Sequence, residues 1–151
     1  VTGVSASGLS LILLAIGVAG FIGTLGVSTL LNARFYQTLM TIPLLMALIA
    51  GTLLLVGHHA WTVAVLLSLW GMLATAAPTG WWTWIARTLP DNAEAGGGLM
   101  VAVIQLSIAL GSTTGGLVFD RLGWQSAFGL SGILLLAAVG MTLYTSRQMT
   151  Q

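Results

Sequence analysis

The chain has 151 residues, of which 57% are hydrophobic and only 5% are charged. A soluble domain is about a quarter charged, because its surface has to be hydrated. The composition therefore excludes an ordinary soluble domain and predicts a surface that faces lipid. The net charge of +1 and the 4 basic residues provide no patch that could neutralise phosphates, so no nucleic-acid partner is expected.

Five apolar stretches are long enough to cross a bilayer, whose hydrocarbon core is about 30 Å thick and needs roughly 20 residues of helix. Helices are expected, because lipid offers no partner for backbone N–H and C=O groups. The predicted fold class is an all-α membrane protein with five transmembrane helices. The expected spans are 8–31, 38–56, 61–85, 95–119 and 127–144.

The basic residues predict the orientation of these spans. Arg34, Arg87 and Arg147 fall on one side of five alternating spans, and Arg121 falls on the other. Short cytoplasmic loops are enriched in Lys and Arg, so the side with three arginines is expected to be cytoplasmic. This orientation places Val1 outside the cell and Gln151, with the C-terminus, inside.

The first span carries glycines three residues apart at Gly17, Gly20 and Gly23. Glycines thin a helix and let a neighbouring helix approach closely, so these three are expected at a helix contact. Small polar residues, among them Thr24, form a neighbouring stripe at helical spacing. Two interpretations stay open: this stripe packs against another helix, or it is one wall of an aqueous cavity in which Thr24 contacts a substrate.

The second span is almost uniformly aliphatic and is interpreted as an outer support, as is the fifth. His58 and His59 follow the second span and are interpreted as an interfacial turn. Adjacent histidines can bind a metal, but no third ligand lies nearby in the sequence. The chain also has no cysteine, so neither a metal site nor a cofactor is expected.

The third span contains a proline that should weaken the helix. Pro78 removes an internal backbone hydrogen bond, and Gly80 adds conformational freedom two residues later. Interrupted helices in transporters often bend near the binding region. Pro78 and Gly80 are therefore predicted to form a hinge.

Indole rings line the same span. Trp70 and Trp81 share one helical face, and Thr75 lies on the next. Indoles stack on flat ligands and donate N–H hydrogen bonds, so Trp70, Thr75 and Trp81 are candidate substrate-binding residues. The alternative for the tryptophans of 81–84 is the aromatic belt at the membrane interface.

Gln105, in the fourth span, is the only amide within any expected span. An amide in lipid needs a partner, which is either another helix or a ligand in a central cavity. Ser112 shares its face and is a second candidate contact. Asp91 and Glu94, before this span, are expected to start its helix as a capping box. Three glycines of the span are expected to pack against a helix: Gly111, Gly115 and Gly116.

Several motifs can be compared with a known family. They are 21–24, Trp70-Gly71 with 78–87, 102–106, Gly115-Gly116 with Asp120, and 130–132. Together they resemble the C-terminal half of a major facilitator superfamily transporter of the drug:proton antiporter group, similar to bacterial purine ribonucleoside efflux pumps.

The resemblance implies a twelve-helix fold in which the five spans are the eighth to twelfth helices. It implies that the first, third and fourth spans line a cavity, that the second and fifth lie outside, and that the protein is in the bacterial inner membrane. It also implies that the N-terminal half and the seventh helix are missing partners. The loop 32–36 lacks the acidic-basic signature often seen at this junction in the superfamily.

The predicted function is efflux of small polar or aromatic molecules, such as purine nucleosides or drugs, by proton antiport with alternating access. No Asp, Glu or His lies inside an expected span, so the proton-coupling group is expected in the missing half. An enzyme is not expected, because the spans hold no nucleophile with a base and no paired carboxylates. The alternatives are a structural or regulatory multi-span membrane subunit and a passive facilitator.

Overall fold

The computed structural model describes residues 5–148, so both expected ends, Val1 and Gln151, lie outside the described residues. Within that range the chain is helical, with no strand. Five helices are long and apolar enough to cross a membrane, which confirms the predicted fold class. The elements are α1 (Ala6–Ala33), α2 (Phe35–Val56), α3 (Ala60–Thr88), the short 3-10 helix η1 (Pro90–Asn92), α4 (Ala93–Leu122) and α5 (Trp124–Gln148).

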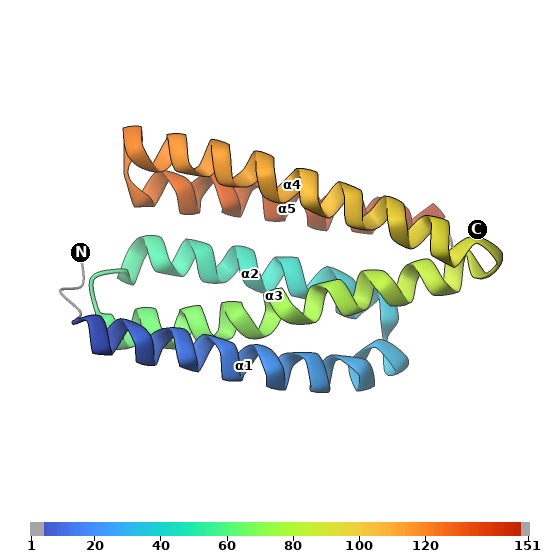
Figure 1. Ribbon diagram of the computed structural model, residues 1–151, viewed down its shortest axis with the longest axis horizontal. Helices are drawn as coiled ribbons and strands as arrows, with labels where there is room; N and C mark the ends of the chain where they lie inside the picture. The colour runs from blue at the N-terminus through green and yellow to red at the C-terminus, as the bar shows by residue number, and fades with distance from the viewer. Residues whose placement is uncertain (1–4, 149–151) are drawn as a thin grey trace.

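The five long helices run alternately in opposite directions, so the two ends of the described chain lie at opposite ends of the bundle (Figure 1). α3 packs on α1 and on α2, and α2 also packs on α5. α4 packs on α5 and meets α3 toward the turn that joins them, whereas α1 and α4 share no contact. The bundle is therefore well packed around α3 and open beside α4.

Local sequence explains where the helices around α4 begin and end. Pro90 stops α3, because the residue before a proline is displaced from helical geometry. Glu94 lies in the first turn of α4 as expected, but Asn92 is its N-cap and makes no side-chain cap, so the predicted capping box is wrong. Gly123 closes α4 with a φ of 83°, a left-handed conformation that glycine adopts at little cost.

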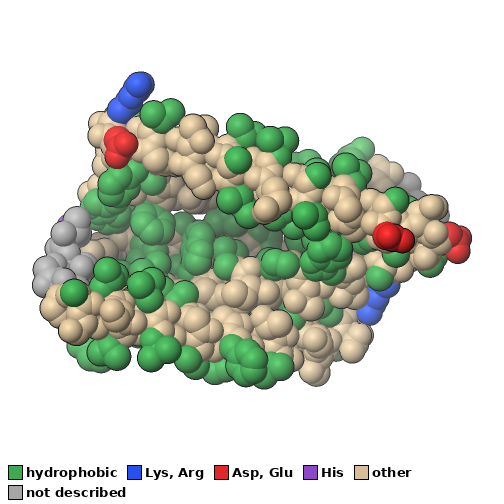
Figure 2. Space-filling view, in the orientation of Figure 1, with side chains coloured by type: hydrophobic (Ala, Val, Ile, Leu, Met, Phe, Trp, Pro, Cys, Tyr) green, Lys and Arg blue, Asp and Glu red, His purple; other side chains and the backbone are tan. Residues whose placement is uncertain are grey.

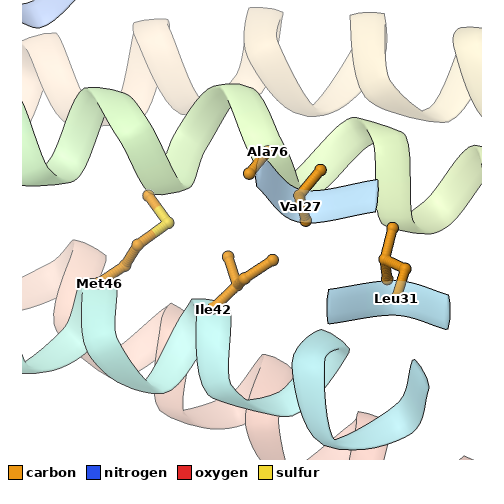
Figure 3. Close-up of a cluster of buried hydrophobic side chains, with 5 residues drawn as sticks. All are labelled: Val27, Leu31, Ile42, Met46 and Ala76. Atoms are coloured by element: carbon orange, nitrogen blue, oxygen red, sulfur yellow. The ribbon is translucent and has the colours of Figure 1, made fainter. Parts of the chain in front are cut away.

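One cluster of buried apolar side chains lies where α1, α2 and α3 meet (Figure 3), made of Val27, Leu31, Ile42, Met46 and Ala76. α2 has six buried residues, the largest number of any helix, whereas α4 and α5 have one each. The buried residues of α2 recur every three or four positions, while its Leu44, Leu48 and Leu55 are exposed. The second span thus has one buried face and one open face, and its role as an outer support stays a prediction.

The contact between α1 and α3 depends on glycine. A Cβ on Gly20 would lie 3.0 Å from Cγ2 of Thr75, and a Cβ on Gly23 would overlap the backbone carbonyl of Met72. The two backbones therefore approach more closely than any other residue at Gly23 would allow. Across this contact the Thr75 hydroxyl donates a hydrogen bond of 2.8 Å to the carbonyl oxygen of Gly20.

Candidate functional site

α4 presents polar side chains without partners. Its only buried residue is Gly97, and both Gln105 and Ser112 are exposed. Neither of these two side chains has a hydrogen-bond partner among residues 5–148. They lie two helical turns apart, about 10 Å along one face. An unpaired amide is costly in hydrocarbon, so this face of α4 is suited to water or to further protein.

The surface beside α4 is hollowed. Figure 2 shows an opening between α4 and the layer that contains α1, and exposed apolar side chains line both sides of it. The charged side chains in this view gather at the two ends of the bundle and leave the middle uncharged. The opening therefore separates α4 from α1 and has no charged side chain in its middle.

A pocket of about 410 Å³ lies between the end of α3 and the start of α4. The Trp81 and Trp84 rings meet edge to face in it, with centroids 6.2 Å apart, and Trp81 is 38% exposed. No charged side chain lines the pocket, so its chemistry suits an apolar or aromatic group. Its lining residues are Trp81, Trp84, Ile85, Leu89, Gly96, Leu99, Met100, Val103 and Ile104.

Trp70 occupies a different environment from Trp81. Its ring meets Phe128 of α5 edge to face at 6.5 Å and packs against the core cluster. Phe128 in turn meets Trp124 at 6.3 Å, and Trp124 meets His58 at 6.4 Å. These four rings connect the α2–α3 turn to α5, so Trp70 is engaged in packing between helices.

The two candidate threonines converge on one backbone atom. The Thr24 hydroxyl donates to the Gly20 carbonyl oxygen at 3.1 Å, and Thr75 donates to the same oxygen. Thr75 also lies 2.9 Å from the carbonyl oxygen of Gly71. The structure therefore brings Thr24 and Thr75 together at the α1–α3 contact, where both hydroxyls have backbone acceptors.

The candidate hinge lies in a continuous helix. α3 runs through Pro78 without interruption. Gly80 is buried, and a Cβ there would lie 2.7 Å from Cδ2 of Leu39 on α2. Gly80 thus allows close packing of α3 on α2, and the hinge at Pro78 and Gly80 stays a prediction.

The glycines expected to pack helices separate into two groups. Gly20 and Gly23 lie against α3, whereas a Cβ on Gly17 would meet nothing within 4 Å. The expected packing glycines of α4 are Gly111, Gly115 and Gly116, and a Cβ on any of them would also meet nothing within 4 Å. They line a hollow of about 370 Å³ between α4 and α5, together with side chains of both helices.

Two contacts were missed by sequence reasoning. The Arg87 guanidinium carbon lies 4.5 Å from the centre of the Phe35 ring, and its Nη2 lies 3.4 Å from Oδ1 of Asn32. Arg87 therefore fastens the end of α3 to the α1–α2 turn, which no local pattern indicates. Gly71 with Thr75 is a small-xxx-small pair, a signal that could have located the α1–α3 contact.

These features define a multi-pass helical membrane protein in which Gln105 and Ser112 of the fourth long helix have no hydrogen-bond partner within residues 5–148. The chain is 59% identical over 147 residues to the transcription regulatory protein OpdE of Pseudomonas aeruginosa, a match covering 97% of this chain. It is 42% identical over 134 residues to the purine ribonucleoside efflux pump NepI of Salmonella enteritidis, covering 89% of this chain. The NepI of Salmonella typhimurium is 41% identical over the same length.

The chain spans about a third of the length of the curated relatives it matches, 37% of OpdE and 34% of NepI. No protein-family model matches the chain. No solved structure matches it. The sequence match relates the chain to proteins that include an efflux pump, which supports a relation to transporters.

Proposed function

We propose that this chain is a C-terminal part of a secondary active transporter that exports small polar or aromatic molecules, purine nucleosides among them. The observation that carries the proposal is the unpartnered polar face of α4, with Gln105 and Ser112 exposed, in a chain 42% identical to an efflux pump named for purine ribonucleosides. A helix that only anchors a protein gains nothing from an amide in its middle, because lipid cannot satisfy it.

In this proposal the five helices are the eighth to twelfth of a twelve-helix major facilitator fold, and the remaining helices cover α4. Two observations support this arrangement. The match covers only 37% of OpdE and 34% of NepI, and α1 and α4 leave an open space between them. The bundle end that holds Arg34, Arg87 and Arg147 is then cytoplasmic, in the inner membrane of a bacterium.

Gln105 and Trp81 are the proposed centre of substrate binding. The amide can donate and accept hydrogen bonds, and the partly exposed indole offers a flat apolar face. This pair suits a flat, neutral ligand with a polar edge, and Ser112 adds a hydroxyl two turns along α4. Thr24, Thr75 and Trp70 act in this scheme by positioning α1, α3 and α5 around the site, since their polar or aromatic groups are engaged between helices.

Transport in this scheme proceeds by alternating access, with the two halves rocking around a site near the midplane and α3 bending at Pro78 and Gly80. The proton-coupling group is proposed to lie outside this chain. Asp91, Glu94 and Asp120 all lie at the ends of α4 or in the preceding turn. Replacing each by its amide is expected to leave proton-driven export unchanged. Loss of coupling in any one of the three variants would contradict this part of the proposal.

Export of a radiolabelled purine nucleoside from cells expressing the full-length transporter tests the main proposal. Gln105→Ala is expected to lower export about tenfold, the effect of losing one buried hydrogen bond. Gln125→Ala is the matched control, because Gln125 is an exposed amide in the first turn of α5, and it should export normally. Both variants must reach the membrane in equal amounts. Normal export by Gln105→Ala would assign Gln105 to packing.

A regulatory membrane subunit is the second candidate, favoured by the name of the relative OpdE. With 4 basic residues in 151, the chain offers little to hold DNA directly, so regulation would act through another protein or through the level of an exported inducer. A transcript profile separates these routes. If Gln105→Ala lowers export as expected and the transcript profile stays that of the wild type, regulation does not depend on transport. Collapse of the proton gradient separates an antiporter from a passive facilitator.

A further inference from the structure

Two hollows on the α1–α2–α3 layer join into one groove. The first, of about 490 Å³, lies at the α1–α2 turn and has Arg34 and Gln37 at its mouth. The second, of about 220 Å³, lies farther along α1 and includes Met72 and Ala76 of α3. They are continuous because four residues line both: Leu30, Thr38, Ile42 and Leu73.

The groove has the length of one membrane leaflet. From Arg34 to Ile22 it follows about 12 residues of α1, or about 18 Å. Half of the hydrocarbon core of a bilayer is about 15 Å thick. Ile22 is 57% exposed and Leu30 is 60% exposed, so the groove is open along its side. Gly26 gives it depth, because a Cβ there would meet nothing within 4 Å.

The groove is apolar inside and basic at its mouth. Arg34 makes one long contact, 3.5 Å from its Nη1 to Oε1 of Gln37, which leaves other guanidinium N–H groups and the Gln37 amide N–H groups able to donate. No carboxylate lines either hollow. The 3 acidic residues of the chain lie elsewhere, on η1 and α4: Asp91, Glu94 and Asp120. The mouth of the groove therefore favours an anion.

We propose that this groove binds an anionic phospholipid, with the phosphate at Arg34 and Gln37 and one acyl chain along Leu30, Leu73 and Gly26. A flat ligand is a poor fit, because no aromatic ring lines the groove. This inference is independent of what the protein transports.

Native mass spectrometry of the full-length protein in detergent tests the headgroup, with dioleoyl phosphatidylglycerol and dioleoyl phosphatidylcholine as probes. Arg34→Gln should weaken phosphatidylglycerol binding about fivefold, the effect of one basic residue near an anionic lipid, and leave phosphatidylcholine unchanged. Arg147→Gln is the matched control, because Arg147 is exposed in the last turn of α5 and removes the same charge. Equal losses in the two variants would overturn the proposal, since binding would then follow net charge alone.

A second pair of variants tests the acyl chain. Gly26→Leu fills the groove and should lower binding of both lipids at least fivefold, whereas Gly17→Leu, on the same helix and also in open space, should not. Helical circular dichroism checks the fold of each, and Gly26→Ala, which adds one methyl group, replaces Gly26→Leu if that variant unfolds. Unchanged lipid binding in the filled groove would overturn the proposal. If Gly26→Leu instead abolishes a dimer and leaves lipid bound, the proposal is also overturned, because the groove would then hold a second copy of the protein.

Discussion

α1 and α4 are both glycine-rich membrane helices, and they use their glycines in opposite ways. In α1, a Cβ on Gly23 would overlap the backbone of α3 and one on Gly20 would crowd the Thr75 side chain, because α3 lies directly against them. In α4, Gly111 and Gly115 are four residues apart instead of three, and both face open space. The comparison teaches that a glycine pattern marks where a helix can be approached, and that the presence of a partner decides whether it is. Four predictions test this contrast, from the largest expected effect to the smallest.

Gly23→Ala should destabilise the bundle by about 1–3 kcal/mol, the usual cost of forcing a methyl group into a packed interior. The rigid atom in its way is the backbone carbonyl of Met72, which cannot move without α3. Unfolding in a denaturing detergent, followed by far-ultraviolet circular dichroism, measures the change. Gly17→Ala is the control on the same helix and should not destabilise. Equal stability of the two variants would show that α1 and α3 are less close than described.

Arg87→Gln should cost about 0.5–1 kcal/mol, since it removes an exposed cation–π contact with Phe35. This contact holds the α1–α2 turn on α3. Arg121, near the end of α4, has no such contact among residues 5–148, so Arg121→Gln should cost less than about 0.5 kcal/mol. Added salt should leave the difference largely in place. The same unfolding measurement compares the two variants. A larger loss of stability in Arg121→Gln than in Arg87→Gln would contradict the prediction.

Thr75→Val should cost about 0.6 kcal/mol, the average for a hydrogen bond between membrane helices. The substitution keeps the side-chain shape and removes the bond to the Gly20 carbonyl oxygen. Thr52→Val is the matched control, because Thr52 donates only within α2, to Leu48. A double variant with Gly20→Ala reports whether the two sites are coupled. Full additivity would mean that Thr75 does not act through Gly20.

Gly111→Ala and Gly115→Ala should each lower the stability of the 151-residue chain by no more than about 0.5 kcal/mol. They can also raise it, since alanine is the better helix former by about 1 kcal/mol. The methyl groups enter the hollow between α4 and α5. The same two substitutions in the full-length protein sharpen the test. Destabilisation there, and only there, would locate a partner helix on this face of α4.

Length and polarity of the apolar stretches were enough to predict the five helices, because a bilayer fixes how many residues must be apolar and forces the backbone to be helical. The spans 61–85 and 95–119 each lie within a single observed helix, α3 and α4. Gln105 is exposed, and whether its partner is a further helix or a ligand stays a prediction.

Pairwise contacts could not be predicted in the same way. Thr75 meets Gly20 across a separation of 55 residues, and Trp70 meets Phe128 across an even longer one. A helical-wheel argument assigns such residues to a face but cannot tell which helix covers it. The predicted capping box failed for a local reason, since Pro90 starts a 3-10 turn and moves the N-cap from Asp91 to Asn92.

The alternation of five helices decides which of their ends can be reached from the same side of the membrane. Because the helices alternate, the first turn of α1 and the last turn of α5 lie at opposite ends of the bundle. A protease that is added on one side of the membrane should therefore reach only one of these two turns, and an antibody against the other should bind only after the membrane is permeabilised.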